Sequence, residues 1–252
     1  MTDAITREHV VVAVENQPAM AAYLACPTKP GAHAAVIVGM ELFGVTRHIR
    51  NVTDRVAALG YLAIAPDFYH RAESGVELAY DQAGRNKGFE LLHQLSREDA
   101  LQDVQATLRF LRQRPDCQGQ VGFLGFSVGG HIGYLAATQL DLAASAIYYA
   151  GWLTNTDIEL SQPEPTLTLT PGMAKKGGRL MYFVGEHDFL IPAGQREAIA
   201  SALEQAAVDH EMIVYPGVSH GFFCDERDGY DPVAHDDAWA RTRSLFETAL
   251  RA

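Results

Sequence analysis

The most constraining feature of this sequence is a glycine-rich corner, Gly125-Phe126-Ser127-Val128-Gly129, which follows an apolar run and precedes an Ala-rich segment at 132–140. This order predicts a strand, a tight turn and a helix, with Gly-x-Ser-x-Gly at the turn. Glycines two positions before and after the serine let backbone segments approach closely. A helix N-terminus behind the hydroxyl favours developing negative charge. The pattern is typical of a nucleophile elbow, although a plain glycine-rich turn has the same residues.

Around this corner, short apolar runs alternate with helical patterns from about residue 34 to the end of the chain. Residues 34–38 are wholly apolar, as expected for a strand buried on both faces. Residues 46–59 carry apolar side chains at helical spacing, and residues 61–65 form the next apolar run. This succession indicates a parallel strand-helix-strand unit. Before it, residues 9–15 and 20–25 predict two strands joined by a turn.

The alternation continues without an internal repeat or a linker. The remaining expected elements are a helix at 97–112, strands at 122–124, 143–149 and 179–184, a helix at 192–207, a strand at 211–215 and a helix at 235–250. Residues 70–97 predict either an excursion beside the site or a solvated connection with a short helix, and residues 151–178 predict a loop. We therefore expect one α/β domain, residues 1–252, with a doubly wound, mostly parallel sheet and an antiparallel hairpin at its N-terminal edge.

Composition narrows the classes of partner. The formal net charge of −11 argues against a nucleic-acid or acidic-membrane partner. The three cysteines, Cys26, Cys117 and Cys224, form no CxxC motif and predict neither a disulfide framework nor a zinc site. The first eight residues lack the apolar core of a signal peptide, and no apolar run approaches the ~20 residues of a membrane span. We expect a cytoplasmic protein.

Four predicted loops at the carboxyl ends of strands carry residues suited to catalysis, and in open α/β sheets sites form at these ends. The loops contain Glu41-Leu42, Ser127-Val128, Asp188 and His220. Acyl transfer needs a nucleophile, a base and a group that orients the base. The chain order serine, acid, histidine is that of α/β-hydrolases. Alternatively, Asp188 is a helix N-cap and His220 is one of ten ordinary histidines.

These residues predict specific roles. Ser127 attacks an acyl carbonyl, His220 takes its proton, and Asp188 orients the imidazole. The backbone N–H of Val128 is one expected oxyanion donor, and the other is expected near Leu42. We expect no cofactor and no metal, and a small-molecule ester or lactone as the substrate.

Three other histidines receive structural interpretations. His187 is expected to face away from the site if Asp188 faces in, and His131 is expected to be structural. The run His235-Asp236-Asp237 predicts a helix N-terminus with favourable acidic charge rather than a metal site.

At several of these stretches the chain resembles the dienelactone hydrolase family. The similar stretches are 41–45 with 49–50, 60–61 with 65–71, 125–130, 185–188 with Pro192, 219–222, and 230–239. The resemblance implies a compact α/β-hydrolase fold with little or no lid, which opens lactones and esters without a cofactor. It implies that Asp188 and His220 are the acid and base, and that Glu41 matches a glutamate that modulates the nucleophile.

Two positions depart from the family pattern. The family nucleophile is typically Cys, whereas this chain has Ser127, whose hydroxyl must lose its proton to a base as it attacks. Family enzymes that act on dienelactone hold its carboxylate with an Arg shortly after the histidine, where this chain has Cys224. We therefore expect a neutral ester or lactone, with Arg227 and Arg71 as alternative carboxylate ligands.

Other functions remain open at this point. They are carboxymethylenebutenolidase activity proper, a thioesterase or peptidase on the same fold, and a catalytically silent protein of this fold that binds a small molecule. The sequence does not determine the oligomeric state.

Overall fold

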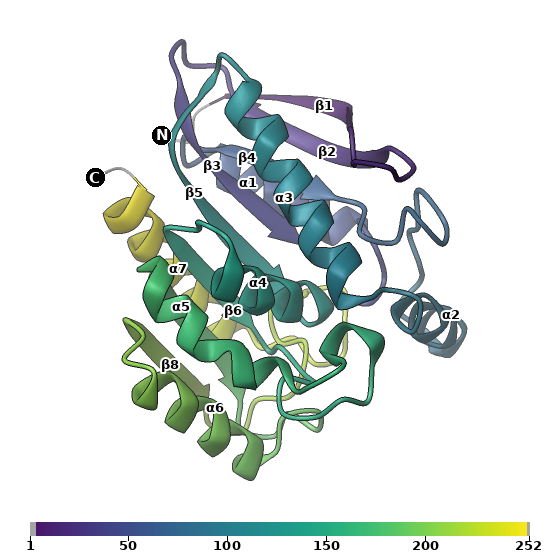
Figure 1. The fold of residues 1–252 in the computed structure, drawn as a ribbon, viewed down its shortest axis with the longest axis vertical. Coiled ribbons are helices and arrows are strands. Elements are labelled where there is room, and N and C mark those ends of the chain that lie inside the picture. Colours follow the sequence, from purple (N-terminus) through teal and green to yellow (C-terminus); the bar gives the residue numbers. More distant parts are fainter. Residues whose placement is uncertain (1–3, 251–252) are drawn as a thin grey trace.

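The structure, a computed structural model, describes residues 4–250, and an eight-stranded sheet runs through that part of the chain (Figure 1). The strands are β1 (Ile5–Val12), β2 (Met20–Pro27), β3 (His33–Gly39), β4 (Leu62–Pro66), β5 (Cys117–Phe126), β6 (Ala144–Tyr148), β7 (Arg179–Gly185) and β8 (His210–Tyr215). Their order in the sheet is β1-β2-β4-β3-β5-β6-β7-β8. The pairs β1–β2 and β2–β4 are antiparallel, and all other pairs are parallel. The predicted mostly parallel sheet with an N-terminal edge hairpin is confirmed.

Helices cover both faces of this sheet. They are α1 (Arg47–Ala57), α2 (Gln82–Leu92), α3 (Arg97–Gln113), α4 (Val128–Gln139), α5 (Thr170–Lys176), α6 (Ala193–Gln205) and α7 (Pro232–Leu250), with short 3-10 turns at Glu159–Ser161 and Thr166–Leu169. In Figure 1, α3 and α4 lie in front of the sheet, whereas α1 and α7 lie behind it. Within residues 4–250, none of the helices combines the length and hydrophobicity needed to cross a bilayer.

The burial patterns of the central strands and helices match their positions in the fold. Every residue of β4 and β6 is buried, as expected for strands covered on both faces. α1 buries one face, which includes Ile49, Val52 and Val56, and Gly60, with φ of 95°, turns the chain into β4. α4 is different, because nearly all of its residues are buried. A helix that is apolar all round belongs inside the protein, and α4 stands directly behind the glycine-rich corner.

Three predicted boundaries and one predicted loop are wrong. The first strand, predicted at 9–15, is β1 (Ile5–Val12), because its register with β2 runs from Ile5 opposite Pro27 to Val12 opposite Met20. The last helix begins at Pro232, not at residue 235, because the Asp231 carboxylate accepts hydrogen bonds from the backbone N–H groups of Val233 and Ala234. The first turn of α7 therefore contains no acidic residue, and the prediction that His235-Asp236-Asp237 forms an acidic helix N-terminus is wrong. β5 begins at Cys117, five residues before the predicted strand. The stretch 151–178 is not all loop, since it contains α5. Gly177, with φ of 74°, ends α5 in the left-handed conformation that favours glycine.

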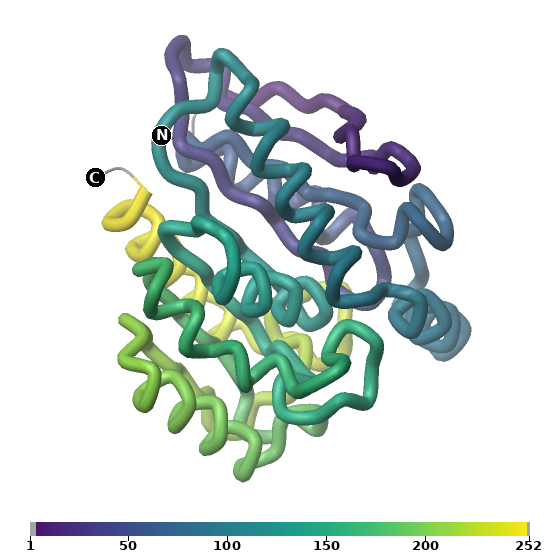
Figure 2. The backbone as a smooth tube through the Cα atoms, viewed as in Figure 1, coloured from purple at the N-terminus to yellow at the C-terminus, as the bar shows by residue number. Residues whose placement is uncertain are grey.

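The stretch between β4 and α3 leaves the sheet and carries α2. The Asp81 carboxylate caps α2 by accepting a hydrogen bond from the N–H of Gly84 at 2.8 Å. The arrows of β3 and β5 in Figure 1 point toward the side of the molecule where the tube of Figure 2 traces this segment and the segment after β6. Both predicted irregular stretches therefore lie at the edge of the sheet where the predicted site residues also lie.

Candidate active site

Ser127 occupies a strained corner between β5 and α4. Its φ of 52° and ψ of −109° are rare for a residue with a side chain. Glycines make the corner possible: a Cβ at Gly125 would overlap the main chain of Gly129, and a Cβ at Gly129 would overlap the main chain of Gly39. The Ser127 N–H donates to the carbonyl of Tyr148 at 3.0 Å, which ties the corner to β6. The local geometry is that of a nucleophile elbow.

The structure brings together three side chains that are far apart in the sequence. The Ser127 Oγ lies 3.1 Å from the His220 Nε2, and the His220 Nδ1 lies 2.8 Å from the Asp188 Oδ2. All three residues are buried, with 4%, 6% and 3% of their surface exposed, respectively. Because a carboxylate can only accept, Nδ1 carries the imidazole proton and Nε2 is free to accept the serine proton.

Asp188 is held in place from both of its oxygens. The Oδ1 atom accepts a hydrogen bond from the backbone N–H of Leu190 at 2.9 Å, while Oδ2 faces His220. The alternative interpretation of Asp188 as the helix N-cap is wrong, because Pro192 occupies that position of α6. The neighbouring His187 side chain is 66% exposed, in agreement with the prediction that it faces away.

A backbone hydrogen bond joins the two segments that carry the expected oxyanion donors. Leu42 follows β3, and Val128 is the first residue of α4. The backbone N–H of Gly129 donates to the carbonyl of Met40 at 2.8 Å, so the start of α4 is fixed against the loop that contains Leu42. Leu42 and Ser127 line the same cleft.

Glu41 is buried and bound to two side chains. Its Oε1 accepts hydrogen bonds from the Arg227 Nη1 at 2.9 Å and from the Tyr149 hydroxyl at 3.2 Å. Its Oε2 has no hydrogen-bond partner among residues 4–250. The carboxylate therefore neutralises Arg227, one of the two expected alternative ligands for a substrate carboxylate, and braces the loop next to Leu42.

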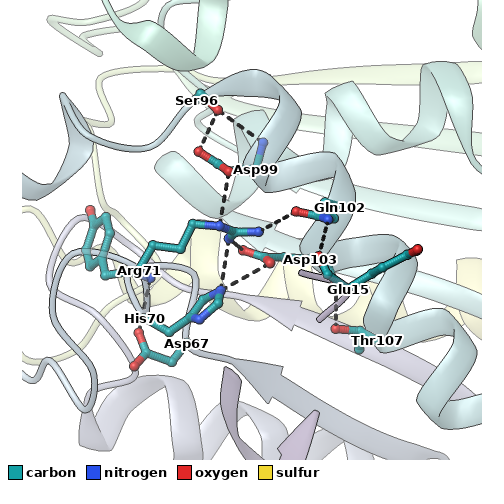
Figure 3. A network of polar contacts seen from close by, with 10 residues as sticks. Glu15, Asp67, His70, Arg71, Ser96, Asp99, Gln102, Asp103 and Thr107 are labelled. Carbon is teal, nitrogen blue, oxygen red and sulfur yellow. Dashed lines mark hydrogen bonds and ion pairs between the residues drawn. The ribbon is translucent and has the colours of Figure 1, made fainter. Parts of the chain in front are cut away.

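The other alternative ligand, Arg71, points elsewhere. Its guanidinium pairs with Asp99 at 3.0 Å and with Asp103 at 2.6 Å on α3 (Figure 3). Cys224 is buried near Glu41, and burial raises the pKa of its thiol to about 12. A protonated thiol is a poor nucleophile. Cys224 therefore does not compete with Ser127 for this role.

A cleft of about 100 Å³ opens at Ser127 and His220. It is also lined by Leu42, Phe43, Arg85, Phe89, Trp152, Phe189, Leu190 and Arg227. Trp152 has a positive φ of 58°, which marks a strained main chain at the wall of the cleft. The Phe189 ring is 67% exposed and lies 5.5 Å from the His220 ring, edge to face. The walls are thus largely aromatic, and Arg85, at the α2 side, is a cation for which residues 4–250 provide no ion-pair partner.

Sequence reasoning missed four of these wall residues, Arg85, Phe89, Trp152 and Phe189, although weak signals for them exist. Phe189 directly follows Asp188, and Trp152 closely follows a strand that ends at the site edge. Arg85 and Phe89 are four residues apart, which places them on one face of α2. The last signal is useful only once α2 itself has been identified.

His131, on α4, is buried and contacts the segment that leads to the cleft residue Trp152. Its Nδ1 lies 2.9 Å from the Gly151 carbonyl, and its Nε2 lies 2.8 Å from the Thr166 hydroxyl. Because the carbonyl can only accept, Nδ1 donates and Nε2 accepts from Thr166. Gly151 precedes the strained Trp152. The structural interpretation of His131 therefore agrees with its contacts.

This neutral imidazole predicts acid sensitivity of the fold. Burial lowers the pKa of His131 to about 4, from an ordinary 6.5. The unfolded chain binds the proton first, so the free energy of unfolding falls as the pH drops from 6.5 to 4, by about 3 kcal/mol from this residue. We expect the His131→Gln variant to lose this part of the dependence of the free energy of unfolding on pH. A variant of the exposed His187, His187→Gln, is expected to keep it. Urea unfolding across this range measures the slope. Equal slopes in both variants would contradict the assignment.

Comparisons with known proteins agree with this geometry. The profile of the dienelactone hydrolase family matches residues 20–250. A Synechocystis sp. protein named "Putative carboxymethylenebutenolidase" is 39% identical over 247 residues, which cover 96% of this chain and 97% of that protein. A Salmonella typhimurium protein of the same name is 30% identical, over 90% of this chain and 82% of that protein.

A solved structure leads to the same family. The Klebsiella pneumoniae protein described as "Putative Dienelactone Hydrolase" superposes with a TM-score of 0.87 and 27% identity, covering 97% of this chain and 99% of that chain. The match of the family profile to most of the chain, the doubly wound sheet and the elbow all point to one conclusion. The chain belongs to the dienelactone hydrolase family and has its α/β-hydrolase fold, that of enzymes which hydrolyse ester bonds.

Proposed function

We propose that this protein is a serine hydrolase that cleaves a carboxylic ester or lactone through an acyl-enzyme. The observation that carries the proposal is the continuous relay from the Ser127 hydroxyl through His220 to Asp188, with contacts of 3.1 Å and 2.8 Å. A hydroxyl is a weak nucleophile unless a base takes its proton during attack. His220 is within reach to do so, and the relay opens on a cleft.

In the proposed reaction, the Ser127 Oγ bonds to the substrate carbonyl carbon while its proton moves to the His220 Nε2. The imidazolium is stabilised by Asp188, and its proton then passes to the leaving alkoxide oxygen as the ester bond breaks. For a lactone, this oxygen stays attached to the acyl group. Water then attacks the acyl-enzyme with His220 as base, which releases the acid and restores Ser127.

The tetrahedral intermediate carries a negative oxygen that needs donors. We assign these to the backbone N–H groups of Val128, at the N-terminus of α4, and of Leu42. Glu41 is assigned a supporting role, because its hydrogen bonds run to Arg227 and Tyr149. In this proposal Glu41 holds the loop that carries Leu42 and keeps Arg227 neutralised. We also propose that residues 1–252 act as one domain around this site.

The cleft favours a small substrate with a flat apolar part. Phe89 and Trp152 meet edge to face, with ring centres 6.3 Å apart, and Phe189 with Leu190 completes the lining. Such surfaces suit an unsaturated or aromatic group. The lead proposal is a neutral ester or lactone, since Glu41 already neutralises Arg227 and the net charge of the protein is −11.

A second candidate, carboxymethylenebutenolidase activity proper, is supported by Arg85. Arg85 lines the cleft, and its guanidinium has no ion-pair or hydrogen-bond partner among the described residues, so it is available to pair with a substrate carboxylate. The names of the Synechocystis and Salmonella relatives support the same candidate.

A matched pair of lactones, one with a carboxylate and one with its methyl ester, separates the two candidates. We expect the neutral lactone to be opened with a kcat/KM at least equal to that of the anionic one. We also expect Arg85→Gln to change the neutral value less than twofold, because a neutral substrate gives Arg85 no charge to pair with. Steady-state kinetics at fixed ionic strength, with Lys87→Gln on the same helix as control, measure both values. A more than tenfold preference for the anion that Arg85→Gln removes would favour the second candidate.

A further inference from the structure

Tyr69 contacts the loop that contains Leu42, one of the two proposed oxyanion donors. It lies in the turn that follows β4, its side chain is buried with 2% of the residue exposed, and its hydroxyl donates to the carbonyl of Leu42 at 3.2 Å. Burial raises the pKa of this phenol, so it remains an O–H donor throughout the pH range of an enzyme assay. The contact joins two segments that are 27 residues apart in the chain.

The Leu42 carbonyl has little room to find another donor. α2 packs against it through Gly88, where an added Cβ would lie 2.8 Å from the Leu42 oxygen and 2.7 Å from the Leu42 Cγ. Only a glycine allows this approach. Without the Tyr69 hydroxyl, the carbonyl would be a buried acceptor with no donor among residues 4–250, a state that costs about 1–3 kcal/mol and is relieved by movement of the peptide.

Hydrogen bonds from the backbone to one carboxylate fix the turn that carries Tyr69. The Asp67 carboxylate accepts hydrogen bonds from the backbone N–H of Tyr69 at 3.1 Å and from that of Gly75 at 2.7 Å. These two bonds tie Tyr69, and the chain that continues to Gly75, to one side chain. The Tyr69 ring therefore projects from a defined main chain rather than from a free loop.

A second set of contacts anchors the same turn to α3. His70 and Arg71 reach across to the fully buried Asp103, with the His70 Nε2 3.2 Å from Oδ1 and the Arg71 Nη1 2.6 Å from Oδ2 (Figure 3). Arg71 also donates to Gln102 at 2.8 Å. This network explains the position of Arg71, which the cleft does not use. It makes the 67–71 turn a rigid support.

We propose that Tyr69 is a positioning residue for the hydrolase reaction. Its hydroxyl holds the Leu42 carbonyl, which belongs to the peptide after Leu42, and so restricts rotation about the Leu42 main chain. The Leu42 N–H, in the peptide before it, thereby stays directed at the developing oxyanion. The inference rests on the proposed function, because it needs an acyl-transfer step at Ser127. Tyr69 acts through Leu42, so its loss weakens transition-state binding and leaves ground-state binding in the cleft nearly unchanged.

The test is Tyr69→Phe, which removes one oxygen and keeps the ring. With p-nitrophenyl acetate we expect kcat to fall about tenfold while KM stays within twofold of the unmodified enzyme, a smaller loss than deletion of an oxyanion donor itself. Tyr134→Phe is the matched control. It loses a similarly buried hydroxyl contact, to Thr170 at 2.6 Å, where α4 meets the start of α5, and its kcat is expected to be unchanged. Titration of Ser127 with a fluorophosphonate normalises each rate to the folded fraction.

A second measurement distinguishes positioning from a general loss of stability. Phenylboronic acid forms a tetrahedral adduct with an active serine, so its Ki is expected to rise about tenfold in Tyr69→Phe and to stay constant in Tyr134→Phe. An unchanged kcat and Ki, or a raised KM with unchanged kcat, would overturn the role of Tyr69. These outcomes differ from failure of the proposed function, in which the unmodified protein itself would not be labelled at Ser127.

Discussion

Ser127→Ala is expected to lower kcat for p-nitrophenyl esters by roughly 10⁵- to 10⁶-fold, to near the uncatalysed rate. The variant removes the atom that forms the acyl-enzyme, and the structure offers no substitute at that position: Cys224 is buried and its pKa is raised to about 12. Residual turnover would come from the oxyanion donors and from binding alone. Initial rates at substrate saturation, corrected for background hydrolysis, measure the effect.

The control for this variant is its stability. Ala keeps the Cβ at a position whose φ of 52° is unfavourable for either residue, so the strain of the corner is nearly the same. We expect the Tm of Ser127→Ala to lie within a few degrees of that of the unmodified protein. A fully folded variant with undiminished ester hydrolysis would contradict the assignment of the nucleophile.

Asp188→Asn is expected to lower kcat by about 10⁴-fold, the scale seen when the acid of a serine triad is replaced by its amide. The amide N–H of Asn would donate to the His220 Nδ1, which moves the imidazole proton to Nε2. His220 could then no longer accept the proton of Ser127, although the 3.1 Å contact between them persists. The loss is thus one of protonation state and not of geometry.

Asp141→Asn is the matched control for this effect. Asp141 is exposed and pairs with Lys176 at 3.0 Å on the surface, so the change is expected to leave kcat unaltered. The same initial-rate assay applies to both variants. If Asp188→Asn hydrolysed esters within tenfold of the unmodified enzyme, the proposed tautomer role of Asp188 would be wrong.

Much of the fold was predictable because its strands are buried on both faces. The wholly apolar run of residues 34–38 lies within β3, and the runs near β4, β6 and β7 were recognisable in the same way. α5 was missed, because its seven residues lie within a Thr- and Pro-rich stretch of low helix propensity. Gly172 of α5 lies against Thr138 of α4 and Met173 is buried, and this packing is a tertiary effect that no local pattern contains.

The reacting residues of the candidate site were more predictable than its walls. Ser127, Asp188 and His220 each follow a strand, and parallel strands deliver their carboxyl ends to one edge. Arg85 and Phe89 come from an excursion whose direction depends on packing, such as the contact of Gly88 with Leu42. The expected alternatives Arg71 and Arg227 turned out to be occupied by Asp103 and Glu41, which sequence spacing could not show.

The central claim is that Ser127 is made nucleophilic by His220. Labelling of the intact protein with a fluorophosphonate, followed by digestion and mass spectrometry of the peptides, tests it most directly. We predict one adduct, on Ser127, formed at a rate that falls at least a hundredfold in His220→Asn. Stoichiometric labelling of another residue, or a labelling rate at Ser127 that His220→Asn leaves unchanged, would contradict the account.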